Sequence, residues 1–510
     1  MKTDGTQAKI NKRITLVVVI AAALLVVGIA LALLIPYFVG RRVDYLRDDL
    51  SKYISIPEEK YGEFTLNIKI APPKEFEIDE LIMAEQIKYK TLSGLGEYQR
   101  EGEIGVGDLL LLRYYAFTED GAVAGASNLL GESEDYTVGA GFYLMGDRIV
   151  GLDQGILGKR VEGYSNIGTA GVVSDGCVVY ISYEMTDGES ITTVKDARID
   201  LSDSALDEKM GEGFREYLIG KTVGATSTER LTVTLGGASV TYYAVKISAT
   251  GLPLTVEGLL PYDYSDPSMA GETVSFDLYI DKIVDYNVPT VDEEFITHKL
   301  GLKDKLESGY SEGTLYEKYR LYLEEQLHQE YLELKAILTE EALWQYLSSS
   351  ATVIKLPKNE VEAQYDSYYS ELRFEYESLG GSMALGEFAR IYLGLSESAD
   401  WEGYLRSISE ESVKQKLVFF YVIRESGLIP SGDALTECRE DALENYITSE
   451  LLSLGVDESD FKTKEEYAEY RAGIKAELIE SLGEEYFDEL AYSVWGVEKL
   501  LERATVKETP

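Results

Sequence analysis

The chain has 510 residues, of which 45% are hydrophobic, and this is enough to form packed cores and excludes wholesale disorder. Its length predicts roughly three domains of about 150 residues each. The 90 acidic and 48 basic side chains give a net charge of -42 with no local basic patch, which excludes nucleic acid as a partner because phosphate backbones would be repelled.

Cysteine and histidine are too sparse for a structural metal site. Cys177 and Cys438 lie far apart without a CxxC spacing, and His298 and His328 are the two histidines of the sequence. A zinc or iron-sulfur site needs a tighter cluster of such ligands. We therefore expect no metal and no cofactor, while the sequence leaves open whether the cysteines form a disulfide or two buried thiols.

A long apolar run follows a short basic stretch at the N-terminus. Residues 14–39, ITLVVVIAAALLVVGIALALLIPYFV, carry no charge, and about 20 apolar residues suffice to cross a bilayer. A buried core helix would show a polar stripe, and a cleaved signal peptide would have a shorter apolar run with a small-residue exit site. We therefore expect an uncleaved transmembrane helix at 14–39 that contacts the lipid bilayer.

The flanking charges orient this expected helix. Lysine and arginine are slightly more frequent before the run than after it, where acidic residues offset them. Positive charge favours the cytoplasmic side, so residues 1–13 are expected to be a cytoplasmic tail. The expected localisation is the cell membrane, as a single-pass protein whose bulk is extracytoplasmic.

Three compositional zones follow. Residues 41–104 form a linker or α+β segment leading into an arm, with a strand expected at 63–70 and a helix at 75–92. Residues 105–289 are rich in Gly, Val, Thr and Tyr, with alternating runs separated by turn residues, and predict β-sheet. Residues 290–510 are acidic and periodic and predict helices, the clearest at 314–347, 359–380 and 409–427.

The predicted fold class is therefore α+β. It consists of the N-terminal transmembrane helix, an antiparallel β region with a short helix, and an all-α C-terminal domain with helical arms. The role of residues 440–510 is left open, because their helical pattern continues without a distinctive motif.

One phrase occurs twice in the β zone. GLDQGILGKRVEG at 151–163 returns as GFREYLIGKTVGA at 213–225, each with a glycine ahead of a short helical turn and a following Gly-Lys-x-Val. Internal repetition of this kind indicates that one supersecondary unit is used twice. Two unrelated β units that share a common turn would give the same pattern.

The first copy belongs to a longer pattern that resembles the FKBP-type prolyl isomerase domain. The pattern begins with VGDLLLLRYYAFTEDGAVAG at 106–125, runs through 151–163, and closes with PYDYSDPSMAGETVSFDLYIDKIVDYNVP at 261–289. A shorter unit at about 172–250 separates the two parts. The resemblance implies an FKBP-like domain at 105–289 with a second, nested FKBP-like unit.

The resemblance also implies a set of pocket residues. They are apolar or aromatic side chains: Tyr114, Ile149, Leu152, Tyr264 and Phe276. An isomerase of this type needs no nucleophile, because a dry aromatic pocket favours the twisted amide before proline. Ala124 and Gly125 stand where the family has Phe-Asp, and Leu152 stands where an aromatic floor is usual, so turnover is expected to be slow or absent. The five residues would also suit the core of any small β domain.

The order of the later segments resembles trigger factor. VPTVDEEFITHKLG at 288–301, a long helix, and VIKLPKNEVEAQYDSYYSELRFEYESLGG at 353–381 follow the β zone, as the helical substrate-binding domain follows the isomerase domain in that family. The resemblance covers roughly residues 76–437. The basic ribosome-docking segment of the family has no counterpart here, so ribosome binding is not expected.

These resemblances imply a membrane-tethered extracytoplasmic chaperone or foldase. Its partners would be unfolded or nascent exported polypeptides, including proline-containing segments, and it would have peptidyl-prolyl cis-trans isomerase activity if the pocket works. The alternative is a catalytically inactive FKBP-like scaffold or binding protein of the cell envelope.

Overall fold

The computed structural model describes residues 43–93, 102–118, 121–130, 132–144, 146–161, 167–188, 190–264, 266–379, 383–396, 398–454, 456, 461 and 463–509. The chain divides into two compact units. We call residues 69–334 the β-sheet unit, and the described residues up to 68 together with 335–509 the helical unit. The helix α7, Leu315–Ser350, contributes to both.

The expected transmembrane helix is not supported. Within the described part of the chain, no helix combines the length and the apolar character that crossing a membrane requires, because the long helices carry charged side chains along their length. Residues 14–39 themselves, on which the expectation was placed, lie outside the described residues. The membrane part of the fold class and the single-pass membrane localisation are therefore corrected, and contact with the lipid bilayer through 14–39 is not shown. The α+β character of the remainder is confirmed.

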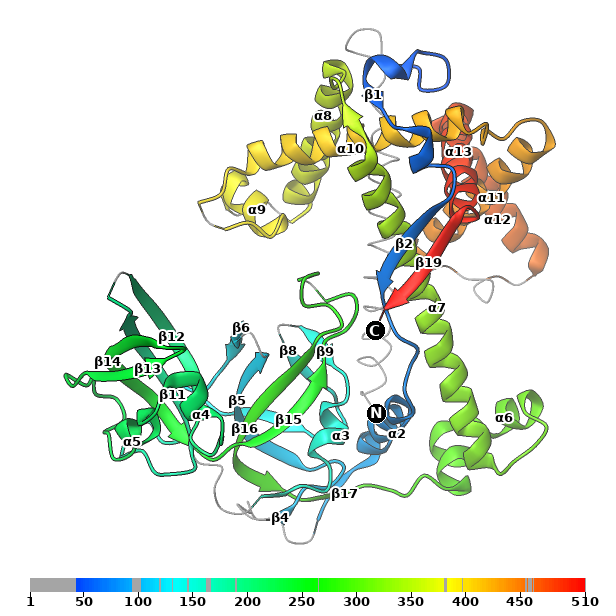
Figure 1. The fold of residues 1–510 in the computed structure, drawn as a ribbon. Coiled ribbons are helices and arrows are strands. Elements are labelled where there is room, and N and C mark those ends of the chain that lie inside the picture. Colours follow the sequence, from blue (N-terminus) through cyan, green and yellow to red (C-terminus); the bar gives the residue numbers. More distant parts are fainter. Residues whose placement is uncertain are drawn as a thin grey trace. The chain divides into compact units, whose positions relative to one another are not determined.

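The β-sheet unit contains a five-stranded antiparallel sheet of order β15-β16-β5-β6, with β7 also paired to β5 (Figure 1). Register is set by pairs such as Leu278 with Tyr114. Alternate residues of these strands enter one core cluster, as period-2 patterning requires. The strands are β5 Leu109–Thr118, β6 Gly121–Ser127, β7 Glu134–Thr137, β15 Leu254–Leu259 and β16 Thr273–Val284.

Short elements close this sheet. The hairpin of β8 Phe142–Leu144 and β9 Asp147–Ile149 leads into the short helix α3 Leu152–Ile156, which packs against β15. Two separate two-stranded ladders also belong to this unit: β4 Gly102–Glu103 with β10 Arg160–Val161, and β3 Thr91–Leu92 with β17 Tyr286–Asn287.

A second, four-stranded sheet of order β12-β11-β14-β13 has its own hydrophobic core. Its chain segment runs between β10 and β15, so it interrupts the segments that form the first sheet. Its elements are β11 Val178–Thr186, β12 Ile191–Asp200, α4 Leu206–Met210, α5 Phe214–Leu218, β13 Leu231–Leu235 and β14 Ala238–Gly251.

The repeated phrase builds the same local structure in both places. Gly151 precedes α3 with φ 85°, and Gly213 precedes α5 with φ 88°, a left-handed conformation that glycine adopts without strain. After each helix the chain turns extended, at Leu157 with φ -58° and ψ 134° and at Ile219 with φ -58° and ψ 133°. The sequence similarity therefore marks one glycine-bounded helical turn that is used in both sheets.

A small helical layer completes the β-sheet unit. The helix expected at 75–92 forms α2 Glu75–Gln86, then a 3-10 turn at Ile87–Tyr89, and ends in β3. Ile78 and Ile82 of α2 pack against Ile296, Leu306 and the first part of α7. The π-helix at Phe295–Leu300 and α6 Lys303–Gly309 supply those partners.

The helical unit joins the first described segment to the C-terminal helices. The strand expected at 63–70 is confirmed as β2 Phe64–Lys69, and it pairs with the last strand, β19 Ala504–Thr509 (Figure 1). Likewise β1 Ile54–Ser55 pairs with β18 Thr352–Val353. Side chains of 45–66 pack in one core with α7, α8, α10 and α13. The helices are α8 Lys358–Ser378, α9 Leu385–Tyr392, α10 Trp401–Glu425, α11 Asp433–Leu454, α12 Lys464–Leu482 and α13 Glu484–Leu501.

Candidate functional site

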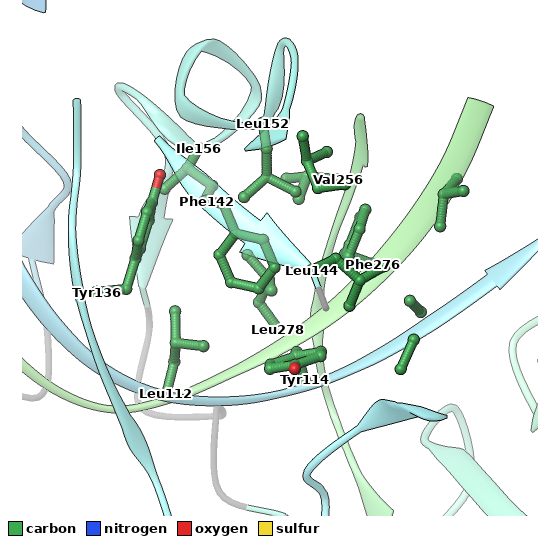
Figure 2. Close-up of a cluster of buried hydrophobic side chains, with 14 of the residues drawn as sticks. Leu112, Tyr114, Tyr136, Phe142, Leu144, Leu152, Ile156, Val256, Phe276 and Leu278 are labelled. Carbon is green, nitrogen blue, oxygen red and sulfur yellow. The ribbon is translucent and has the colours of Figure 1, made fainter. Parts of the chain in front are cut away.

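The predicted pocket residues come together in the core of the five-stranded sheet. They arrive from different elements: Tyr114 on β5, Ile149 on β9, Leu152 on α3, Tyr264 in the loop after β15 and Phe276 on β16. Ile149, Leu152 and Phe276 are fully buried, and Tyr114 and Tyr264 retain only 9% and 6% exposure. Figure 2 shows Tyr114, Leu152 and Phe276 pointing into the same cluster.

Local structure explains why these side chains converge. Tyr114 and Phe276 occupy inward positions of neighbouring strands in the alternating pattern. The left-handed Gly151 lets α3 begin immediately after β9, which directs Leu152 inward. Gly258 on β15 has no side chain, and a Cβ there would lie 2.3 Å from Ile149 Cγ2, so this glycine makes room for Ile149.

Phe142 occupies the centre of the cluster and was not among the predicted pocket residues. Its ring meets Tyr114 edge-on at 5.2 Å between centroids, Tyr136 at 5.5 Å and Phe276 at 5.5 Å (Figure 2). Such edge-to-face contacts add to the burial of the rings. The alternation of Phe142 and Leu144 in GFYLM was the available signal. In this structure the predicted residues form a packed core around Phe142.

Desolvation controls the ionisation of the tyrosines in this cluster. It raises the pKa of Tyr114, with a further contribution from Glu134, and the pKa of Tyr264, with contributions from Asp147 and Asp266. Both hydroxyls therefore stay protonated near neutral pH and can donate hydrogen bonds. The cluster offers an apolar surface with hydroxyl donors and no activated nucleophile.

A buried carboxylate fixes the turn before Phe142. Asp153 is 1% exposed and accepts hydrogen bonds from the Tyr136 hydroxyl and from the backbone N–H groups of Gly139 and Gly141, the last at 3.0 Å. Burial and the neighbouring Asp153 charge raise the pKa of Tyr136 well above its ordinary value. This network holds the chain at 139–141 and thereby positions Phe142.

A second buried carboxylate links α2 to the start of α3. Glu80 accepts hydrogen bonds from the Gly151 N–H at 2.8 Å and from Arg148 Nη2 at 3.0 Å. Desolvation raises the pKa of Glu80 to about 7, and the charge of Asp153 adds to this although Arg148 opposes it. Glu80 therefore titrates near neutral pH at a contact that positions Leu152.

A separate candidate surface lies in the helical unit, on α8, α9 and the beginning of α10. We call residues 358–406 the arm; α9 lies at its end (Figure 1). Its interior is a small cluster with Leu372, Phe388, Ala389 and Leu405 at its centre. Tyrosines surround that cluster, and the Tyr376 and Tyr392 rings pack on Phe388 at 5.6 and 5.5 Å.

Large apolar side chains remain exposed around the end of the arm. Phe374, Leu379 and Ile391 are 70%, 69% and 65% exposed. Met383, Tyr392 and Tyr404 are also exposed. Exposed apolar groups that gather in one region indicate an interaction surface, whereas scattered ones need no explanation.

The arm is also acidic. Its carboxylates outnumber its basic side chains, and two of the basic ones are paired within it: Arg406 with Glu362 at 2.8 Å and Arg373 with Glu377 at 2.9 Å. Desolvation and then the charge of Glu375 raise the pKa of Glu371. The arm therefore presents apolar side chains in a negatively charged setting.

Comparisons with known proteins give a weak likeness to solved structures. No protein-family model matches the chain, and no curated protein matches it. One solved structure that matches is described as "Promiscuous Substrate Recognition in Folding and Assembly Activities of the Trigger Factor Chaperone". The alignment covers 86% of this chain and 73% of the chain in that structure, with 12% sequence identity and a TM-score of 0.22. This similarity is too low to carry a functional argument.

Proposed function

We propose that this protein is a chaperone that binds unfolded polypeptides through the end of its arm. The exposed apolar side chains at Phe374, Leu379 and Ile391 carry the proposal, because three large apolar groups that are 65–70% exposed lie within one short stretch of the chain. The order of segments that resembles trigger factor led to the same expectation.

The chemistry of the arm favours an unfolded occupant. Its exposed groups come from the end of α8, the following loop, α9 and the start of α10, so each of these segments offers a contact point of its own within the arm. Tyrosine supplies a large apolar ring with a polar hydroxyl and loses little rotamer freedom on binding. Such contact points suit chains of varied sequence, whereas a folded partner needs a continuous complementary patch of about 800 Å² on each side.

The test replaces two sets of apolar residues by serine; the two sets are about equally exposed but lie at different positions in the chain. The arm variant carries Phe374→Ser, Leu379→Ser and Ile391→Ser, and the control carries Leu130→Ser, Ile191→Ser and Leu452→Ser, which are 68%, 68% and 67% exposed and lie outside the arm. Substitutions at such exposed sites usually change stability by less than about 0.5 kcal/mol each. Light scattering of reduced insulin measures the suppression of aggregation.

The arm variant is expected to lose most of the suppression shown by the unsubstituted chain, and the control is expected to keep it. Circular dichroism melting confirms that both variants are folded. Equal suppression by all three chains would show that binding does not depend on the arm, and the proposal would then be abandoned.

Prolyl isomerase activity is a second candidate function. It is favoured by the convergence of Tyr114, Ile149, Leu152, Tyr264 and Phe276 in one cluster, although Phe142 fills the space between them. A proline-limited refolding assay with the full chain tests it, with Tyr264→Ala as the variant. Acceleration that is lost in the variant supports catalysis. Absence of acceleration supports the alternative, a catalytically inactive scaffold or binding protein.

A further inference from the structure

The β-sheet unit contains a cleft on the face opposite the predicted isomerase cluster. Its volume is about 170 Å³, whereas a single water needs only about 10–15 Å³. Its walls are apolar and come from β9–α3, β15 and α7, through Val150, Leu259, Leu327 and Leu334. The cleft is therefore large enough for a side chain.

The backbone separates this cleft from the core cluster. Val150 and Leu259 form an antiparallel bridge, with N to O distances of 2.9 and 2.8 Å, and both line the cleft. Their neighbours Ile149 and Leu260 are fully buried in the core cluster. Adjacent residues of extended chain point to opposite faces, so the cleft and the cluster are distinct sites.

Two carboxylates face the cleft from different helices. Glu77 lies in the first turn of α2 and accepts a hydrogen bond from the Lys74 N–H at 2.8 Å, and Glu330 lies on α7. Desolvation raises the pKa of each. The charge of Glu333 and then that of Glu77 raise the pKa of Glu330 further, although Arg148 opposes them.

The fixed charges around the cleft leave it negative. The lining also contains Asp263 and a single cation, Lys74, and the neighbouring Arg148 is already paired with Glu80 at 3.0 Å. Glu77 is half-buried and Glu330 is exposed, and a cation placed between the two carboxylates would relieve their repulsion. Apolar walls around such an acidic pair favour a cation on an aliphatic stem.

We propose that this cleft binds a lysine side chain of an unfolded polypeptide. The lysine stem would cover Val150, Leu259 and Leu334, and its ammonium would lie between Glu77 and Glu330. This proposal rests on the proposed function, since it names one kind of residue that the bound polypeptide would present. It gives the β-sheet unit a role in client selection that does not require isomerase activity.

The experiment uses the full chain and two matched probes. One is a short fluorescein-labelled unfolded peptide, rich in Leu, Phe, Ser and Gly, that carries several lysines; the other has acetyl-lysine at the same positions, which keeps the stem and removes the charge. The test variant is Glu77→Gln with Glu330→Gln, in which the glutamine at 77 can still accept the Lys74 hydrogen bond. The control is Glu208→Gln with Glu212→Gln, an equal change of charge at exposed sites outside the cleft.

Fluorescence anisotropy should show that the unsubstituted chain binds the lysine peptide about tenfold more tightly than the acetylated one. The cleft variant should lose this preference while it binds the acetylated peptide unchanged, and the control variant should keep the preference. A preference that persists in the cleft variant would show that the overall acidity causes it, and would overturn the proposal.

Two further outcomes are informative. Failure of every chain to bind the acetylated peptide would contradict the proposed chaperone function. Binding of the lysine peptide by the unsubstituted chain, and its loss in the cleft variant, would still test the lysine site in the cleft. Free n-butylamine should compete only at millimolar or higher concentration, because it lacks the rest of the polypeptide. Competition at micromolar concentration would identify a site for small amines and would refute the assignment to a client lysine.

Discussion

A buried ion pair joins the two sheets of the β-sheet unit, and its removal is a quantitative test of how they are held together. Asp277 on β16 is fully buried, and Arg198 on β12 donates to both of its carboxylate oxygens, with distances of 2.6 and 3.1 Å. Thr255 and Tyr180 also donate to Asp277, each at 2.7 Å. The pair therefore connects the four-stranded sheet to the five-stranded one.

We predict that Asp277→Asn destabilises this unit by about 3 kcal/mol. Removing one partner of a buried pair costs about 3–5 kcal/mol, because the other charge stays behind. Arg198 is 16% exposed at its side chain and has Asp200 at 3.7 Å as a second partner, which places the cost at the low end of that range. The corresponding decrease in Tm is roughly 6–12 °C.

Hydrogen exchange of the β16 segment, measured by mass spectrometry across a urea series, reports the free energy of unfolding of this unit. The tryptophans, Trp344, Trp401 and Trp495, belong to the helical unit, so their fluorescence is an internal control that should not change. Arg198→Met and the double variant complete a thermodynamic cycle, with an expected coupling of about 2 kcal/mol. A loss below about 1 kcal/mol in Asp277→Asn, or a coupling below about 0.5 kcal/mol, would refute the reasoning.

Two more predictions concern the core cluster and its neighbours. Because the pKa of Glu80 is raised to about 7 in the folded protein, the folded state binds a proton more tightly than the unfolded one. The free energy of unfolding should therefore decrease between pH 4.5 and about 7, by up to about 3 kcal/mol. Urea titrations at pH 5 and 8 measure this decrease, and Glu80→Gln should make it smaller. An equally steep decrease in the variant would contradict the assignment. Gly258→Ala places a Cβ 2.3 Å from Ile149 Cγ2, and the resulting overpacking should lower the free energy of unfolding by about 1–3 kcal/mol. The control is Gly309→Ala on α6, which has open space around it and should not lower this free energy. Similar thermal unfolding of the two variants would show that the glycine at 258 is not required.

Periodicity explains what could be predicted from the sequence. The family pattern, and not alternation, placed Tyr114 and Phe276 together, because β5 begins with four leucines at 109–112 that do not show which face is inward. The helices α7 and α8 follow from their repeating apolar positions and lie close to their predicted ranges, whereas α10 begins at Trp401, eight residues before its predicted start at 409. The repeated phrase predicted a shared glycine-bounded turn, because left-handed backbone selects glycine.

Long-range packing explains what could not be predicted. Whether an aromatic cluster leaves an open pocket depends on the volume contributed by every neighbour, and Phe142 was assigned no role by the family pattern. The contact of residues 45–66 with the last helices depends on partners that are hundreds of positions away, as does the pairing of Asp277 with Arg198. The exposed end of the arm could not be predicted either, because Leu372 and Phe374 are both large apolar residues and the sequence does not show that the first is buried and the second exposed.

The pairing of β2 with β19 has a consequence for synthesis of the chain. The Thr509 hydroxyl donates to the Ile68 carbonyl across 441 positions, whereas residues 69–334 form their unit from one continuous stretch. At about 5–20 residues per second, roughly 20–90 seconds separate translation of the two paired strands. During that interval the β-sheet unit can finish folding, while β2 has no partner strand because β19 has not yet been synthesised. The helical unit therefore completes its folding last.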